Sequence, residues 1–205
     1  MSGRIYLYPL IIRLWHGCNA LLILTLIFTG ASLQYSNLEY PLMRFDLAVS
    51  IHNVAGILLT LTYIWFIISN IYTKNVVHYY LHIKGLFNRI TTQLIYYTWG
   101  MFTGKTSPFP ITAENKFNPL QRFTYVLAMY VFLPVLILSG WGLLFPGIVI
   151  HNIFGLGGIF WADLLHVVMA FLVSAFLIIH VYFCTIGATF YINFKSMIDG
   201  WHVSK

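Results

Sequence analysis

Four long stretches of the sequence contain no Asp, Glu, Lys or Arg, and they limit the possible folds more than any other feature. They cover residues 14–38, 47–73, 123–162 and 164–194. Each is longer than the roughly 20 residues that a helix needs to cross the hydrocarbon core of a bilayer. The third stretch is broken after Phe145 by Pro146 and several glycines, so only its first part is predicted to span.

The composition agrees with a chain that lies mostly inside a membrane. Of the 205 residues, 60% are hydrophobic and only 8% are charged, which leaves too little polar surface for a soluble domain of this size. The sequence therefore predicts an all-α integral membrane protein, one domain over residues 1–205 with a bundle of four transmembrane helices. Their expected bounds are about 14–34, 47–72, 121–145 and 163–187, with a kink at Pro134.

The distribution of basic residues predicts the orientation. If the N-terminus is cytoplasmic, all but one of the 11 Lys and Arg side chains lie inside, and only Arg44 lies outside. The inside set is Arg4, Arg13, Lys74, Lys84, Arg89, Lys105, Lys116, Arg122, Lys195 and Lys205. This asymmetry predicts a multi-pass protein of a bacterial-type inner membrane with both termini cytoplasmic. The net charge of +6 then needs no nucleic-acid partner to explain it.

The segment between the second and third helices, residues 74–118, mixes Tyr and Trp with scattered basic residues. Such a mixture suits a cytoplasmic segment that lies in the membrane interface, with apolar side chains toward the lipid and Lys or Arg toward the head groups. We therefore expect an interfacial segment here.

Two histidines on the fourth helix, His166 and His180, are separated by fourteen residues. Along a helix this is about 21 Å, with the two side chains only about 40° apart around the axis. One helix thus presents an imidazole near each side of the bilayer, both toward the same neighbours. The predicted topology supplies a partner for each, because His16 lies at the inner level on the first helix and His52 lies at the outer level on the second.

Four histidines that sort into two facing pairs point to haem. A flat macrocycle between two helices, with one imidazole on each face of its iron, fits such a pair. Zinc is a weaker alternative, since it prefers four ligands and each level offers two. Gly30, Gly56 and Gly140 near these levels would let a flat ring approach the backbone, although they also suit ordinary helix packing.

The motifs around these histidines resemble those of a known family. They are Arg13-Leu-Trp-His16, Ile51-His52-Asn-Val-Ala-Gly56, the His166–His180 spacing, Lys116-Phe-Asn118-Pro-Leu-Gln121 and Phe194-Lys-Ser-Met-Ile-Asp-Gly200. Together they resemble the di-haem b-type cytochrome subunits of membrane-bound formate dehydrogenases, nickel–iron hydrogenases and thiosulfate reductases. The Lys116–Gln121 motif is especially similar to the thiosulfate-reductase-type branch.

The resemblance implies an electron path across the membrane. It assigns an inner haem b to His16 and His180 and an outer haem b to His52 and His166, with an iron–sulfur subunit and a catalytic subunit on the outer, periplasmic face. A menaquinone or ubiquinone would bind on the cytoplasmic side. The chain would then be an electron-transfer subunit with a quinone half-reaction, and its partner would hold the main catalytic site.

Several residues keep a second interpretation. Asn118 and Gln121 are candidates for the quinone pocket, but Asn118 before Pro119 is equally a helix N-cap. Arg13 could pair with a haem propionate or with a lipid phosphate. His78 and His82 have a metal-ligand spacing, although an interfacial role is favoured.

Two other functions remain open. The chain also resembles four-helix b-type cytochromes that oxidise superoxide at the outer face and reduce quinone by themselves, but only Arg44 could attract an anion there. A haem-free scaffold or metal transporter would show no b-type absorption.

Overall fold

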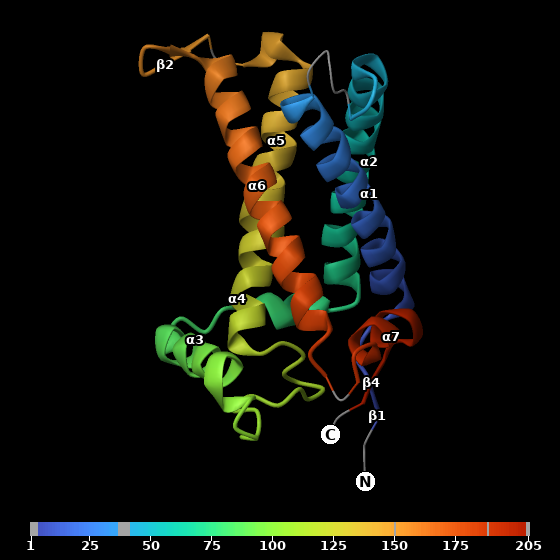
Figure 1. Cartoon of the computed structure of the whole chain (residues 1–205), viewed down its shortest axis with the longest axis vertical. Coiled ribbons are helices and arrows are strands. Elements are labelled where there is room, and N and C mark those ends of the chain that lie inside the picture. The colour runs from blue at the N-terminus through green and yellow to red at the C-terminus, as the bar shows by residue number, and fades with distance from the viewer. Residues whose placement is uncertain (1–3, 37–41, 150, 188, 204–205) are drawn as a thin grey trace. The chain divides into compact units, whose positions relative to one another are not determined.

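The computed structural model describes residues 4–36, 42–149, 151–187 and 189–203. Four helical segments are long and apolar enough to cross a membrane: α1 (Leu10–Tyr35), α2 (Phe45–Tyr72), the joined segment Pro119–Leu144 and α6 (Gly158–Cys184). Figure 1 shows their order along the chain. The all-α membrane bundle is thereby confirmed, while the single-domain interpretation and the cytoplasmic placement of the termini stay predictions.

The third span is not one continuous α-helix. It consists of α4 (Pro119–Leu127), the π turn η3 (Ala128–Phe132) and α5 (Leu133–Leu144). Pro134 is the second residue of α5 and has no N–H to donate to the carbonyl of Tyr130. The π turn ends just before this proline, so the break expected at Pro134 takes the form of a local change in hydrogen-bonding pattern.

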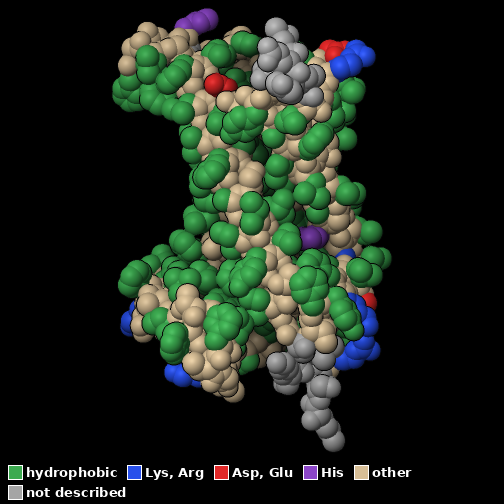
Figure 2. Space-filling view, viewed as in Figure 1, with side chains coloured by type: hydrophobic (Ala, Val, Ile, Leu, Met, Phe, Trp, Pro, Cys, Tyr) green, Lys and Arg blue, Asp and Glu red, His purple; other side chains and the backbone are tan. Residues whose placement is uncertain are grey.

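The chain divides into two compact units, which we name by their content. The helical unit comprises residues 14–68 and 131–178, and the terminal unit comprises residues 1–13, 69–130 and 179–205. All described Lys and Arg residues except Arg44 belong to the terminal unit. Figure 2 shows hydrophobic side chains over the helices of the helical unit, and Lys and Arg side chains on the terminal unit.

Burial in the helical unit is reversed relative to a soluble protein. Thr29 and Ser32 are buried, whereas Leu21 and Phe171 are 70% and 71% exposed. In a bilayer the apolar side chains face lipid and the polar ones must find partners inside the protein. One such partnership joins two helices, since the indole N–H of Trp141 donates to Thr60 Oγ1 at 3.0 Å.

The terminal unit ties the two ends of the chain together. Strand β1 (Arg4–Tyr6) pairs antiparallel with β4 (Trp201–Val203), and α7 (Ile192–Asp199) precedes β4. The N–H groups of Leu7 and Tyr8 donate to the carbonyl oxygen of Gly200. Gly200 has a φ of 87°, and an added Cβ would lie 2.6 Å from the Tyr6 ring, so this position requires glycine.

The segment after α2 contains short helices. They are η1 (Asn75–Tyr79), α3 (Leu86–Ile95) and the π turn η2 (Tyr96–Gly100). Polar Gln93 of α3 is 1% exposed, while Phe87 is 84% exposed. Because apolar side chains point outward and an amide points inward, this is the exposure pattern that an interfacial helix needs.

The connection from α5 to α6 is short and irregular. It contains the 3-10 turn η4 (Pro146–Ile148) and a small hairpin of β2 (Asn152–Ile153) with β3 (Leu156–Gly157). His151, which lies in this connection, is exposed.

Candidate functional site

The imidazoles of His52 on α2 and His166 on α6 face each other in the helical unit. Their ring centres are 6.1 Å apart and their planes differ by 70°. Two bonds of about 2 Å from a metal to imidazole nitrogens, together with the step from each nitrogen to its ring centre, span a separation of this size. The structure therefore brings the predicted outer pair together at a spacing that suits one iron between the rings.

Hydroxyl groups determine which nitrogen of each ring is available. Thr29 Oγ1 donates to the carbonyl oxygen of Thr25 at 2.8 Å and lies 2.9 Å from His52 Nδ1. A hydroxyl has only one proton, so with that proton donated to the carbonyl it accepts from the Nδ1–H of His52. The Nε2 of His52 is then unprotonated, which is the state that binds a metal.

His166 is held in the same way by the third span. Ser139 Oγ donates to the carbonyl oxygen of Val135 at 2.7 Å and lies 3.2 Å from His166 Nδ1. The carbonyl oxygen of Leu136 lies at the same distance from that nitrogen. Both neighbours accept from the Nδ1–H, so His166 also presents a bare Nε2.

Two of the three glycines singled out in the sequence lie against these rings. A Cβ at Gly30 would lie 3.4 Å from His52 Cε1, and a Cβ at Gly140 would lie 3.1 Å from His166 Cε1. Gly56 has no such neighbour within 4 Å. Gly30 and Gly140 thus admit the imidazoles themselves, whereas Gly56 leaves open space on the same helix as His52.

The structure places the other two histidines in different units, and their pairing stays a prediction. His16 on α1 belongs to the helical unit and packs beside Trp15. His180 on α6 belongs to the terminal unit, where its Nδ1 lies 3.4 Å from the Tyr125 hydroxyl. The Sγ of Cys184 lies 3.8 Å from its Nε2.

Asn118 is the N-cap of α4. Its Oδ1 accepts from the N–H of Gln121 at 2.9 Å, while Gln121 Oε1 accepts from the N–H of Asn118 at 3.3 Å. The Nδ2 of Asn118 donates to the Tyr97 hydroxyl at 2.8 Å. The capping interpretation is therefore confirmed, and a quinone contact of Asn118 or Gln121 stays a prediction.

Arg13 joins the start of α1 to the end of α7, because its guanidinium donates to the carbonyl oxygen of Ile198. Both residues lie in the terminal unit. This contact gives Arg13 a structural role in holding α7, and its pairing with a propionate stays a prediction.

Comparison with known proteins identifies the family. The model of the prokaryotic cytochrome b561 family matches residues 7–200. The chain belongs to this family. It is also 37% identical over 199 residues to the Escherichia coli (strain K12) protein named "Putative cytochrome YdhU", an alignment that covers 97% of this chain and 75% of that relative.

Membership of the cytochrome b561 family makes this chain a membrane b-type cytochrome that binds haem b and transfers electrons. The donor set described above fits that group. Two imidazoles with bare Nε2 atoms face each other, and the carboxylate and thiolate groups that would favour zinc are not part of this pair. Haem b would supply an iron that changes between two oxidation states, and His52 and His166 would hold it.

A buried lysine is the feature of this family member that sequence patterns did not reveal. Lys116 is 2% exposed, and its ammonium donates to Asn75 Oδ1 at 2.8 Å. Asn75 Nδ2 donates to Asn70 Oδ1 at 2.6 Å, and Asn70 Nδ2 to the Tyr130 hydroxyl at 3.4 Å. The ammonium also lies 4.3 Å from the centre of the Tyr8 ring. Burial lowers the pKa of Lys116 to about 7.

The interfacial role favoured for His78 and His82 over a metal site stays a prediction. Among the described residues no group of three or more His, Cys, Asp or Glu side chains could hold a metal ion. His82 is exposed, and its Nδ1 lies 3.4 Å from the Arg122 guanidinium. His202 lies in strand β4, where burial lowers its pKa.

Sequence reasoning also missed the hydroxyl partners of the histidines. Thr29, Tyr125 and Ser139 were not singled out, because Ser, Thr and Tyr are common in membrane helices. A signal for two of them was present: Tyr125 and Ser139 are fourteen residues apart, the same interval that separates His166 from His180. On antiparallel helices this match places a hydroxyl opposite each histidine.

Gly140→Ala is expected to impair binding of one haem b. The added Cβ would lie 3.1 Å from Cε1 of His166, so the ring must shift by a few tenths of an ångström against its contacts with Ser139 and Leu136. We expect a clear loss of haem per protein, measured by the pyridine haemochrome assay. Gly147→Ala serves as the control because a Cβ there meets nothing within 4 Å; equal haem content in the two variants would contradict the assignment.

The stability of the protein is expected to rise with pH above 7 because of Lys116. Its pKa is about 7 in the folded state against an ordinary value of 10.5, so between these values the unfolded state binds more protons and the free energy of unfolding increases with pH. Below about pH 7 the contribution is constant. Thermal unfolding between pH 7 and 9.5 measures this slope, and that range stays below the raised pKa values of Tyr8 and Tyr79.

Lys116→Met should flatten the slope. It leaves Asn75 Oδ1 without its donor, which costs about 1–3 kcal/mol, so the pH dependence and not the absolute stability is compared. Lys195→Met, at an exposed position, should keep the wild-type slope. A wild-type slope in Lys116→Met would show that another group is responsible.

Proposed function

We propose that this chain is the quinone-reactive, di-haem cytochrome b subunit of a respiratory oxidoreductase in a bacterial-type inner membrane. It passes electrons across the membrane between a quinone pool on the cytoplasmic side and an iron–sulfur partner on the outer face. The catalytic subunit of the complex is a separate chain, and the thiosulfate-reductase-type branch is the nearest class.

The observation that carries this proposal is the His52–His166 pair. Its two rings are 6.1 Å apart, and a Thr or Ser hydroxyl oxygen lies within 3.2 Å of each Nδ1. An iron with two imidazole ligands has no open position for substrate, so it suits electron transfer. This arrangement favours an electron carrier over an enzyme with chemistry at the haem.

A second haem is proposed between His16 and His180. The fourteen-residue interval on α6 places His180 about 21 Å along the helix from His166. His180 is therefore near the opposite end of the span, where it could bind a second haem on the electron path. Tyr125 near His180 Nδ1 parallels Ser139 near His166 Nδ1. The same kind of hydroxyl partner at both histidines supports the same kind of role.

The quinone is proposed to bind beside the start of α4. Asn118 Oδ1 caps α4 there by accepting from the N–H of Gln121. Its Nδ2 donates to the Tyr97 hydroxyl. An amide and a phenol at the membrane surface can hydrogen-bond the carbonyl oxygens of a quinone. Asn118 and Gln121 would orient the ring, and the nearby water phase would exchange its protons.

The alternative of a self-sufficient superoxide:quinone oxidoreductase is disfavoured by the lack of free positive charge on the predicted outer side. Arg44, which is the only candidate for attracting superoxide there, forms an exposed ion pair with Asp46 at 2.6 Å. Because the carboxylate neutralises the guanidinium, this side of the described structure has no cation left to attract an anion.

Removing one histidine of each pair tests the two-haem arrangement. His180→Ala is expected to lose about half of the haem b and the quinone-dependent reduction of the remainder, whereas His52→Ala should lose the other half. Reduced-minus-oxidised spectra and redox titrations measure both. If His180→Ala kept two haems with normal potentials, the pairing would be wrong.

The quinone site is tested with a substitution that keeps the capping function of Asn118 and removes its amide N–H donor. Asn118→Asp keeps the capping oxygen but removes the Nδ2 donor, so quinol-dependent haem reduction is expected to slow by about tenfold at unchanged haem content. Tyr97→Phe removes the phenol that the proposed pocket also offers, so it should slow the reaction as well. Wild-type turnover and inhibitor binding in Asn118→Asp would count against the proposed pocket.

A further inference from the structure

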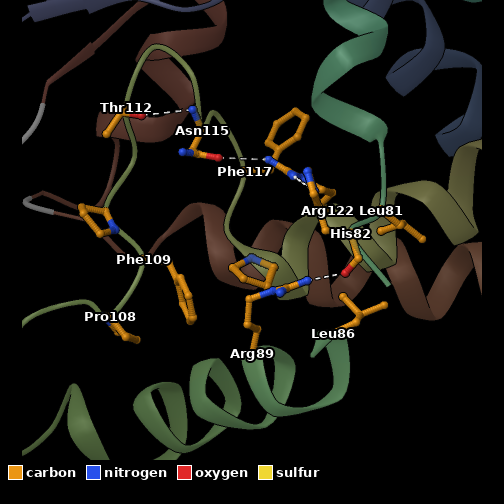
Figure 3. Close-up of a pocket in the computed structure, with 12 residues that line it drawn as sticks. Leu81, His82, Leu86, Arg89, Pro108, Phe109, Thr112, Asn115, Phe117 and Arg122 are labelled. Atoms are coloured by element: carbon orange, nitrogen blue, oxygen red, sulfur yellow. Dashed lines mark hydrogen bonds between the residues drawn. The ribbon is translucent and has the colours of Figure 1, made fainter. Parts of the chain in front are cut away.

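A pocket in the terminal unit combines two arginines with apolar walls. It has a volume of about 370 Å³ and lies between α3, the proline-containing loop before α4 and the first turn of α4. Leu81, His82, Leu86, Arg89, Phe109 and Arg122 form much of its lining. Figure 3 shows Arg89 of α3 and Arg122 of α4 reaching it, with Phe109 on the loop side and Leu86 on the other.

Arg122 has unused hydrogen-bonding capacity in this pocket. Its guanidinium makes three contacts, each at 3.4 Å, to the carbonyl oxygen of Tyr80, to His82 Nδ1 and to Asn115 Oδ1. Its Nε is buried and has no hydrogen-bond partner among the described residues. All three contacts are longer than the usual distance for an N–H donor, so a stronger acceptor would be favoured.

Arg89 is held in position but keeps its charge. It donates to the carbonyl oxygens of Lys84, at 2.8 Å, and of His82. Carbonyl groups do not neutralise a guanidinium, and the single ion pair found among the described residues is the one between Arg44 and Asp46 in the helical unit. The residues that line the pocket include no carboxylate. Two like charges therefore share one pocket, and an anion would stabilise both.

The walls and the position indicate the chemistry of that anion. Phe117 and Pro119 of the lining stand at the start of a spanning segment, and Phe87 of the adjacent α3 is 84% exposed. Hydrocarbon would bury these apolar surfaces, whereas an inorganic ion would leave them wet. The combination suits a phosphate group joined to acyl chains.

We propose that this pocket binds the head-group phosphate of an anionic phospholipid. Arg122 and Arg89 hold the phosphate oxygens, since a planar guanidinium matches a phosphate with two parallel N–H donors. Leu81, Leu86 and Phe109 contact the first carbons of the acyl chains. The bound lipid joins α3 to the start of α4 and fixes the interfacial helix to the membrane.

The proposal is tested with the full-length protein after removal of loosely bound lipid. Native mass spectrometry counts the lipid that remains bound from an equal mixture of phosphatidylglycerol and phosphatidylcholine. We expect one preferentially retained phosphatidylglycerol. Arg122→Gln should weaken its retention by about tenfold or more, the effect of losing a charge-assisted hydrogen-bonded pair.

Two further variants separate binding from folding and from general charge. Phe109→Glu places a carboxylate in the pocket while both arginines remain, so it should expel the lipid without removing their contacts to the backbone. Lys84→Gln removes one charge from the same segment but outside the pocket and should retain the lipid. Unchanged haem spectra verify that each variant is folded.

Three outcomes would overturn the proposal. They are equal retention of the two lipids by the wild type, equal loss in Lys84→Gln and Arg122→Gln, and full retention in Phe109→Glu. Competition with inorganic phosphate is the last test. If millimolar phosphate displaced the lipid completely, the pocket would be a site for the free ion and not for a lipid.

Discussion

The scarcity of water in the bilayer core is the constraint on which the site depends. Every polar group there must find its partner within the protein, and Thr29 and Ser139 satisfy this rule by donating to carbonyl oxygens of their own helices. A hydroxyl whose proton goes to a carbonyl accepts from the imidazole beside it, and the carbonyl oxygen of Leu136 can likewise only accept from His166 Nδ1. A general requirement of membrane helices thus selects one tautomer of each histidine and leaves its Nε2 available to iron.

The terminal unit meets the same constraint with larger polar groups. Lys116 is buried beside Asn75, and its charge is supported by an amide oxygen and the faces of two aromatic rings. Arg122 is also drawn into the protein, where only long contacts are available to it. In the terminal unit, then, these basic side chains lie where the described structure offers them carbonyls, amides and rings but no carboxylate.

Much of the fold could be predicted because a single property determines it. Charge-free runs predicted α1, α2 and α6, and the histidines stood out because imidazoles are rare within such runs. The burial of Lys116 could not be predicted, since it depends on Asn70, Asn75 and Tyr130, which approach it only after folding. Asn118 shows an intermediate case: its sequence context suggested the cap, and the capping box confirms it.

The third span, which has no histidine, emerges as the partner of the helix that has two. Tyr125 contacts His180 and Ser139 contacts His166, and the sum of the two residue numbers is the same in both contacts. The equal sums follow from the shared fourteen-residue interval, which separates Tyr125 from Ser139 and His166 from His180. Each contact lies within one of the two units: Tyr125 and His180 in the terminal unit, Ser139 and His166 in the helical unit. The third span thus contributes no ligand of its own but a hydroxyl beside each of the two histidines of α6, and so influences how the proposed haem ligands are held.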